Sequence, residues 1–158
     1  MKKKLLIVFV SIISVTSCLK RNDKDCSYDP CGFVAPPSEI TAVQNYLISK
    51  SITATQHCSG LFYKIDTLGT GSIPGVCSSV TVNYKGTLTD GTVFDQQNNS
   101  VFFLGGVITG WKNGIPLIKS GGHIHLYIPP SLGYGNQQAG SVPPNSILIF
   151  DIALVGVQ

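Results

Sequence analysis

The spacing of apolar residues changes along the chain from a helical to a strand-like pattern near residue 60. Between residues 38 and 50, three apolar residues recur at intervals of three and four and so share one helical face: Ile40, Val43 and Leu47. This spacing predicts a helix from Ser38 to about Lys50, with Ser38 as its N-cap. We expect its short apolar stripe to pack on the domain that follows.

Beyond Gly60, short apolar stretches alternate with clusters of Gly, Pro, Asn and Asp, which is typical of strands joined by tight turns. The pattern predicts strands at residues 61–67, 80–88, 102–104, 123–128 and 147–155. Asp90-Gly91 is a turn signal directly after the second of these strands. Residues 129–144 form a long stretch rich in Gly, Pro and Gln, and a loop of this length in a compact domain is usually functional.

One segment between the predicted strands has helical spacing. Trp111, Ile115 and Ile118 lie at i, i+4 and i+7 within residues 107–118, which predicts a short helix. Gly114 and Pro116 limit its length, because proline removes a backbone donor and crowds the preceding turn. The elements together predict a mainly β domain of the α+β class, with a helical extension before it.

Composition and charge exclude several classes of protein. Hydrophobic residues make up 43% of the 158 residues and charged residues 12%, a balance that disordered chains do not have. The formal net charge is +3, but removing Lys2, Lys3 and Lys4 from the 11 basic residues leaves 8, against 8 acidic residues. The rest of the chain is therefore neutral and has no basic stripe, so we predict that it does not bind nucleic acid.

The first residues have the features of an export signal. Three lysines precede an apolar run that is too short to span a bilayer but fits the core of a signal peptide, so we predict a signal peptide at residues 1–17. An uncleaved membrane anchor is the alternative. Val15-Thr16-Ser17-Cys18 resembles the lipobox of bacterial lipoproteins, which implies that Cys18 is lipidated and anchors the protein in a membrane of the cell envelope. Leu19 follows the cysteine in place of an acidic residue, which favours the outer membrane.

Four further cysteines follow the predicted lipidation site: Cys26, Cys31, Cys58 and Cys77. An even number in an exported chain favours disulfides over metal binding or nucleophilic roles. Four cysteines allow three pairings, and the short spacing of the first two favours Cys26–Cys31 together with Cys58–Cys77. A zinc site is disfavoured because there is no CxxC pair. Residues 18–37 are polar, end in Pro36-Pro37 and are expected to form the lipidated tether.

The usual catalytic motifs are absent from the sequence. There is one Glu, no carboxylate pair at a catalytic spacing, and no GxSxG nucleophile elbow. His123 and His125 lie at i and i+2 of a predicted strand and so share one face of it. Such a pair can bind a metal, but the sequence shows no third ligand, so we interpret it as a solvent-facing strand surface. We predict neither a metal nor a cofactor.

The order of five segments carries the strongest functional signal. These are VTVNYKGTL at residues 80–88, DGTVFD at 90–95, VITGW at 107–111, IPPSLGYG at 128–135 and VPPNSILIFD at 142–151. In this order and spacing the chain resembles the FKBP-type peptidyl-prolyl isomerases from about Gly60 to its C-terminus. The resemblance implies a strongly bent antiparallel sheet wrapped around one short helix. It also implies an isomerase domain at residues 60–158, preceded by a helical extension at residues 38–59.

The resemblance further implies rotation of X–Pro bonds in proline-containing polypeptides, assisting their folding, and binding of macrolide-type inhibitors. The alternative is a weakly active or inactive peptide-binding or chaperone module of the same fold. The family's binding cup has Trp111 as its floor, with Asp95 and Tyr134 as polar groups at the rim. Its apolar walls are implied at Tyr84, Phe94, Phe102, Val107, Ile108 and Phe150, and Val142 is implied to close one side.

The resemblance also implies that the Tyr134 hydroxyl and the backbone N–H of Ile108 donate hydrogen bonds to a substrate carbonyl. The sequence departs from the family pattern after Asp95, where residues 96–101 contain no arginine that would pair with this aspartate. Ser100 also stands where the pattern has an aromatic wall residue. We therefore expect Asp95 to lie near solvent or to accept hydrogen bonds from Tyr84 or the backbone.

Overall fold

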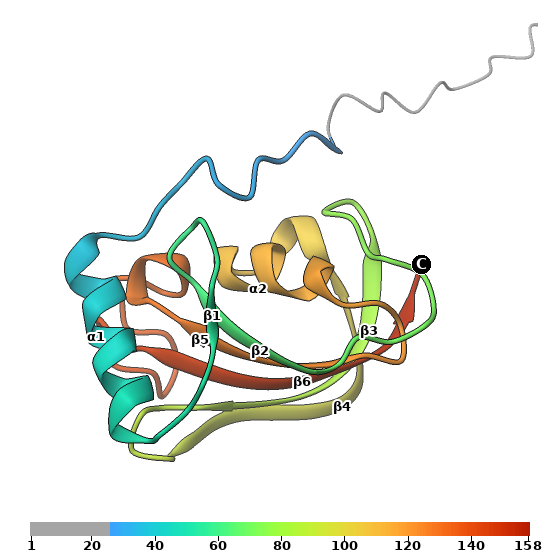
Figure 1. Ribbon diagram of the computed structural model, residues 1–158. Coiled ribbons are helices and arrows are strands. Elements are labelled where there is room, and N and C mark those ends of the chain that lie inside the picture. The colour runs from blue at the N-terminus through green and yellow to red at the C-terminus, as the bar shows by residue number, and fades with distance from the viewer. Residues whose placement is uncertain (1–25) are drawn as a thin grey trace, which may run out of the picture.

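Six antiparallel strands form one bent sheet beneath a short helix (Figure 1). The computed structural model describes residues 26–158, so the predicted signal peptide and Cys18 lie outside the described residues. The strand order is β1-β2-β5-β6-β3-β4. The strands are β1 Thr55–Gln56, β2 Phe62–Thr67, β3 Ser79–Thr87, β4 Val93–Phe103, β5 His123–Ile128 and β6 Leu148–Val157. This arrangement confirms the predicted fold class.

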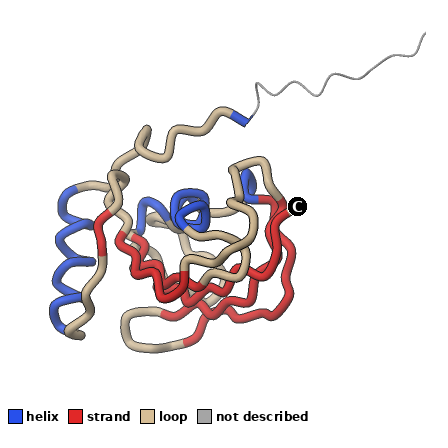
Figure 2. Tube along the Cα trace, turned by 45° about the vertical axis from the view of Figure 1, so that its right-hand side comes forward, coloured by secondary structure: helices blue, strands red, loops and turns tan. Residues whose placement is uncertain are grey.

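The short helix α2, Thr109–Gly114, lies against the concave face of the sheet (Figure 2). It continues into the 3₁₀ turn η3, Ile115–Leu117, so Pro116 ends the α-helix as expected. Two glycines allow close contact with β5: an added Cβ at Gly110 would lie 2.6 Å from Ile128, and one at Gly114 would lie 2.5 Å from Leu126. Larger side chains would push α2, and with it Trp111, away from the sheet.

Strand β4 extends over 11 residues, whereas the sequence predicted only residues 102–104 in this region. Most of β4 is exposed at the edge of the sheet, so its polar run at residues 96–100 has no alternating hydrophobic signal. The prediction also placed Leu104 in a strand, whereas it begins the 3₁₀ turn η2, Leu104–Gly106. The ladder with β3 is irregular near Asn99, whose N–H donates to the side-chain oxygen of Asn83 at 2.7 Å.

Helix α1, Pro37–Ser49, confirms the predicted amphipathic face, since Val43 and Leu47 are buried against Phe62 and Tyr127. The prediction of Ser38 as N-cap was wrong: the cap residue is Pro36, which has no side-chain hydrogen bond, and a proline occupies the first helical turn. Proline fits there because its missing N–H would have no partner inside the helix.

The first carboxylate of α1 makes a tertiary contact. Glu39 accepts a hydrogen bond from the backbone N–H of Ser131 at 2.8 Å. Ser131 belongs to the 3₁₀ turn η4, Pro130–Leu132, so this bond attaches α1 to the segment that precedes Tyr134.

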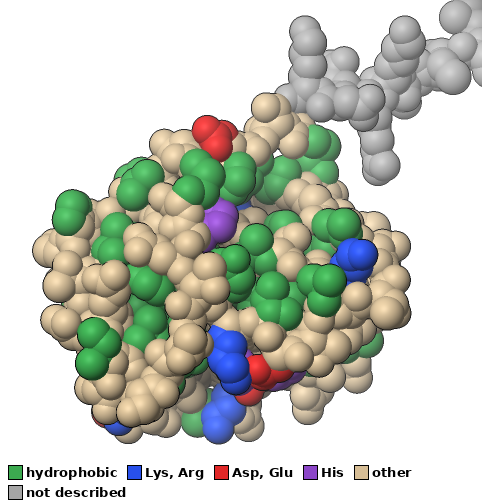
Figure 3. All heavy atoms as spheres, in the orientation of Figure 1, with side chains coloured by type: hydrophobic (Ala, Val, Ile, Leu, Met, Phe, Trp, Pro, Cys, Tyr) green, Lys and Arg blue, Asp and Glu red, His purple; other side chains and the backbone are tan. Residues whose placement is uncertain are grey.

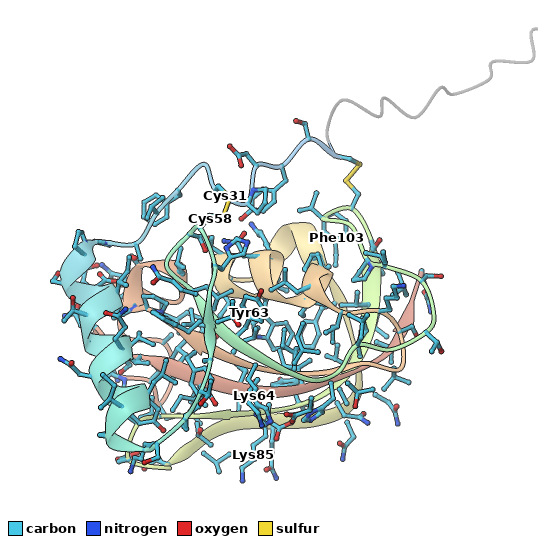
Figure 4. All side chains as sticks on the ribbon, viewed as in Figure 1. Cys31, Cys58, Tyr63, Lys64, Lys85 and Phe103 are labelled. Atoms are coloured by element: carbon cyan, nitrogen blue, oxygen red, sulfur yellow. A yellow bond between two sulfur atoms is a disulfide. The ribbon has the colours of Figure 1, made fainter. Side chains whose placement is uncertain are left out.

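The disulfides join Cys26 to Cys77 and Cys31 to Cys58, so the favoured pairing of neighbours was wrong. After residue 35 the chain runs along α1 and comes back through β1, which brings residues 57–59 beside residues 31–35. The N–H of Ala35 donates to Ser59 O at 2.9 Å. Figure 4 shows Cys31 and Cys58 joined above the sheet. Spacing along the chain could not reveal this return.

The described part of the expected tether is attached to the domain. Besides the two disulfides, the Tyr28 hydroxyl donates to Oδ1 of the buried Asn113 in α2 at 2.6 Å. Ala35 is buried as well. Residues 26–35 are therefore attached to the domain at these points, although residues 26–34 are exposed.

The long loop at residues 129–144 is held together by its own backbone. It contains η4, an isolated bridge between Ala139 and Val142, and a hydrogen bond from Gly135 N–H to Pro130 O at 2.8 Å. Asn145 N–H closes the segment on Gly135 O at 2.8 Å. Within residues 26–158, no helix combines the length and apolar character needed to cross a bilayer.

Candidate active site

A cavity of about 290 Å³ opens between α2, the concave face of the sheet and the loop after β5. Eight of the ten residues that the sequence predicted for the binding cup line it, together with one further residue. The lining consists of Tyr84, Asp95, Phe102, Gly106, Val107, Ile108, Trp111, Tyr134 and Phe150. The sheet, α2 and two loops thus bring together motifs that are far apart in the sequence.

Trp111 stands at the centre of an aromatic cluster. Its ring makes edge-to-face contacts with three neighbours, at centroid distances of 5.1 Å to Tyr84, 5.3 Å to Phe102 and 5.2 Å to Phe150. Such contacts are favourable and fix ring orientation. Because Trp111 is only 4% exposed and comes from α2, which packs closely on β5, it forms the floor of the cavity.

Asp95 has a different partner from the arginine of the family pattern. The hydroxyl of Tyr84 donates to Asp95 Oδ2 at 2.6 Å, across the paired strands β3 and β4. Burial, and then this carboxylate, raise the pKa of the Tyr84 hydroxyl, which therefore keeps its proton at neutral pH. Asp95 itself is exposed, so both parts of the expectation for this residue are confirmed.

Tyr134 lies at the rim, with 40% of its surface exposed. Burial, and then the negative charge of Asp95, raise the pKa of its hydroxyl. The hydroxyl therefore stays protonated and can donate a hydrogen bond into the cavity.

Ile108 contributes its backbone as well as its side chain, because it is the N-cap of α2. Donors at the start of a helix have no partner inside the helix and are available to other acceptors. The lining thus combines an aromatic floor with donors at two sides.

Two predicted cup residues lie outside this lining. Phe94 packs edge-to-face on Phe150 at 5.4 Å, while Val142 is buried beside the Ala139 bridge. Gly106 lines the cavity but was missed; the Gly105-Gly106 pair directly before the VITGW segment was the signal that could have identified it.

The fold and the cavity define a small α+β domain with an aromatic pocket. Residues 71–155, more than half of the chain, match the family FKBP-type peptidyl-prolyl cis-trans isomerase. The chain therefore belongs to this family.

Similar proteins include two named FKBP-type peptidyl-prolyl cis-trans isomerase FkpA. The protein from Buchnera aphidicola subsp. Schizaphis graminum is 47% identical over 105 residues, which cover 63% of this chain and 42% of that protein. The protein from Escherichia coli K12 is 45% identical over 104 residues, covering 63% of this chain and 38% of that protein. The chain thus spans about two fifths of the length of these relatives.

Solved structures show the same fold. The crystal structure of FkpA from Escherichia coli superposes with a TM-score of 0.70 at 38% identity, covering 77% of this chain and 60% of that one. A peptidyl-prolyl cis-trans isomerase from Pseudomonas syringae superposes with a TM-score of 0.68 at 30% identity, covering 80% of this chain and 99% of that one.

Proposed function

We propose that the chain catalyses cis-trans isomerisation of X–Pro bonds in polypeptide substrates, using the cavity above Trp111. The observation that carries this proposal is the arrangement of the lining, in which a buried aromatic floor lies beside the Tyr134 hydroxyl and the start of α2. Membership of the isomerase family supports it.

The cavity suits a reaction in which no covalent bond is formed or broken. Rotation about an X–Pro bond is slow because it interrupts amide resonance, with a barrier of about 18–20 kcal/mol. The planar amide is more dipolar than the twisted transition state, so an apolar cavity that replaces water disfavours the planar form. Shortening the time for isomerisation from tens of seconds to milliseconds is an acceleration of about 10⁴-fold, which requires the activation free energy to fall by roughly 5.5 kcal/mol.

We assign a role to each part of the cavity. The proline ring rests on Trp111 among the walls Tyr84, Phe102, Val107 and Phe150. Tyr134 and the backbone N–H of Ile108 hold the substrate carbonyls, and Asp95 keeps the Tyr84 ring in place through the 2.6 Å hydrogen bond. A macrolide that presents a similar ring and carbonyls would compete for the same cavity.

A protease-coupled assay on a proline-containing peptide tests the proposal. The purified chain, with both disulfides formed, should accelerate the slow phase in proportion to its concentration, and a macrolide of this type should inhibit it. Suppression of aggregation of an unfolded protein without such acceleration would instead support the alternative, a peptide-binding module of low activity.

Tyr134→Phe should lower kcat/KM several-fold without abolishing activity. The change removes one hydrogen bond, worth about 0.5–1.5 kcal/mol, and keeps the ring that forms the rim. Steady-state kinetics of the same peptide measure the effect, with Tyr63→Phe on β2 as a matched control because Tyr63 is not among the residues that line the cavity. Complete inactivation by Tyr134→Phe would contradict a role limited to one hydrogen bond.

We also propose that residues 1–17 direct export, that Cys18 is lipidated, and that the domain acts in the cell envelope, attached to the outer membrane. Two disulfides support an oxidising compartment, where such bonds form and persist. The described residues supply no membrane-spanning helix, so attachment would depend on the lipid.

Cys18→Ala should therefore move the protein from the membrane fraction to the soluble fraction of the cells that produce it. Acyl chains provide the anchor because each buried CH₂ contributes about 0.8 kcal/mol. Fractionation with immunoblotting and labelling with a fatty-acid analogue measure the result. Unchanged membrane partitioning of the variant would overturn the proposal.

A further inference from the structure

Two histidines and two aspartates converge on the convex face of the sheet, on the side away from the cavity. His123 and His125 lie on β5, Asp66 on β2 and Asp151 on β6, so three neighbouring strands contribute. Figure 3 shows acidic, histidine and lysine side chains gathered at the lower edge of the molecule.

The alternation of strand residues explains why this group is accessible. On β5, Tyr127 shares a face with the two histidines, and α1 covers Tyr127 together with Phe62 of β2. The helix ends before it reaches the other end of this face, where the side chains of His123 and His125 are 32% and 24% exposed. The buried residues Ile124 and Leu126 point to the opposite side, toward α2.

The ligand-type atoms are already close together. Asp66 Oδ2 lies 3.1 Å from His123 Nδ1 and 2.7 Å from His125 Nε2. One ring nitrogen of each histidine and one carboxylate oxygen of Asp66 all lie within 4.8 Å of one another. The β2–β5 register shifts between Ile65 and Thr67, and a bulge of this kind re-aims the residue inside it, here Asp66.

Asp151 closes the group from the other side. Its Oδ1 lies 2.6 Å from His123 Nε2, and its Oδ2 lies 3.9 Å from His125 Nδ1. Both carboxylates only accept hydrogen bonds, so the imidazoles are the donors in these contacts. A metal ion beside Asp66 would use Asp66 Oδ2, His123 Nδ1 and His125 Nε2, while His123 Nε2 keeps its contact with Asp151.

We propose that His123, His125 and Asp66 bind a divalent transition-metal ion, with Zn²⁺ as the preferred ion, and that Asp151 orients His123 through its other ring nitrogen. Two imidazoles and one carboxylate are a donor set that Zn²⁺ accepts in tetrahedral geometry with water in the fourth position, at about 2.0–2.2 Å per bond. Ligand atoms around such an ion are about 3.3 Å apart, so Asp66 Oδ2 needs to move away from each of the two imidazole nitrogens by less than about 1 Å.

Two lysines on this face place positive charge near the aspartates and so compete with a metal ion, which provides a test. Lys64 Nζ lies 2.8 Å from Asp66 Oδ1, and Lys85 is opposite Asp151 in the β3–β6 register. Figure 4 shows both lysines on the side of the sheet away from α2. Because the Lys64 side chain is 51% exposed, it can turn into solvent when a cation occupies the site.

A second group of possible ligands consists of Cys31, His57 and Cys58. Its two sulfur atoms are joined in a disulfide, so the thiolates that a metal would need are not available in the oxidised protein. The chain has three histidines, which leaves His57 as a matched control for His123 and His125.

Isothermal titration of the purified oxidised chain with ZnCl₂ alone tests the proposal. We expect one Zn²⁺ per chain with a micromolar Kd, and His123→Ala or His125→Ala should each weaken binding by at least about 10-fold. His57→Ala should leave binding unchanged. Absence of saturable one-to-one binding, or binding that survives loss of both His123 and His125, would overturn the proposal.

Thermal unfolding gives an independent readout. A metal that joins β2 and β5 of the folded state should raise Tm of the wild type with increasing Zn²⁺, and the increase should be absent in His123→Ala. Lys64→Met should tighten Zn²⁺ binding because it removes the competing cation. Weaker Zn²⁺ binding by Lys64→Met would indicate a surface ion-pair network in place of a metal site. The cavity lies on the opposite face, so peptide isomerisation is not needed for either measurement.

Discussion

Replacing Trp111 by alanine is expected to lower kcat/KM for X–Pro isomerisation more than any other single change in the cavity. The substitution removes the surface on which the proline ring rests and the three edge-to-face contacts that orient Tyr84, Phe102 and Phe150. Because the proline ring loses the surface that holds it, kcat/KM should fall at least about 100-fold. Loss of a buried aromatic side chain also costs about 3–5 kcal/mol of stability.

Trp111→Leu separates the loss of the floor from the loss of the fold. Leucine keeps an apolar side chain in the core and should preserve the native circular dichroism spectrum, but it cannot reproduce the flat indole. We expect an intermediate activity, measured on the same peptide as the wild type. Wild-type kcat/KM in Trp111→Leu would show that the indole ring is not the surface that holds proline.

Asp95→Asn provides the contrasting control. Asparagine retains a side-chain oxygen that can accept the Tyr84 hydroxyl at the position now 2.6 Å away, so the wall should stay in place. We expect kcat/KM to fall less in Asp95→Asn than in Trp111→Leu. An inactive Asp95→Asn beside an active Trp111→Leu would point to general-acid chemistry in place of a desolvating cavity.

The cavity could be predicted to a large extent because its residues lie in contiguous motifs. Trp111, Ile108 and Val107 come from one segment and Tyr134 from another, and each motif fixes its own local geometry. Phe94 shows where this reasoning ends: the resemblance implied it as a wall of the cup, whereas its ring contacts Phe150 and is not among the residues that line the cavity. Whether a side chain reaches the cavity depends on how the strands cross, and a motif does not contain that information.

The features that the sequence did not reveal depend on contacts between distant segments. Most of β4 has no hydrophobic periodicity because it lies at the edge of the sheet, and its position is determined by pairing with β3. Asp66 meets His123 and His125 only because β2 pairs with β5 across a bulge. The bond from Ser131 to Glu39 likewise joins residues 92 positions apart.

The disulfide between Cys26 and Cys77 is expected to stabilise the protein strongly without taking part in the reaction. It closes a separation of 51 residues, for which loss of chain entropy in the unfolded state corresponds to roughly 4 kcal/mol. The Cys31–Cys58 bond spans 27 residues and corresponds to roughly 3.5 kcal/mol. Since small domains are stable by about 5–15 kcal/mol, loss of both bonds should leave the fold marginal.

Cys26→Ser together with Cys77→Ser should therefore lower the free energy of unfolding, measured by urea titration, by roughly 4 kcal/mol. The paired change Cys31→Ser with Cys58→Ser should cost slightly less. Peptide mapping without reduction should recover Cys26 linked to Cys77 from the wild type. A fragment that links Cys26 to Cys31 would refute the pairing directly.

Activity distinguishes a stabilising disulfide from one that shapes the site. None of the four cysteines lines the cavity, and Trp111 is held in place by Gly110, Gly114 and β5. In dilute buffer at 25 °C the Cys26→Ser and Cys77→Ser double variant should keep wild-type kcat/KM while its unfolding midpoint falls. A parallel loss of kcat/KM in the folded variant would show that residues 26–35 position α2, and the Tyr28 to Asn113 hydrogen bond would then be the contact to test.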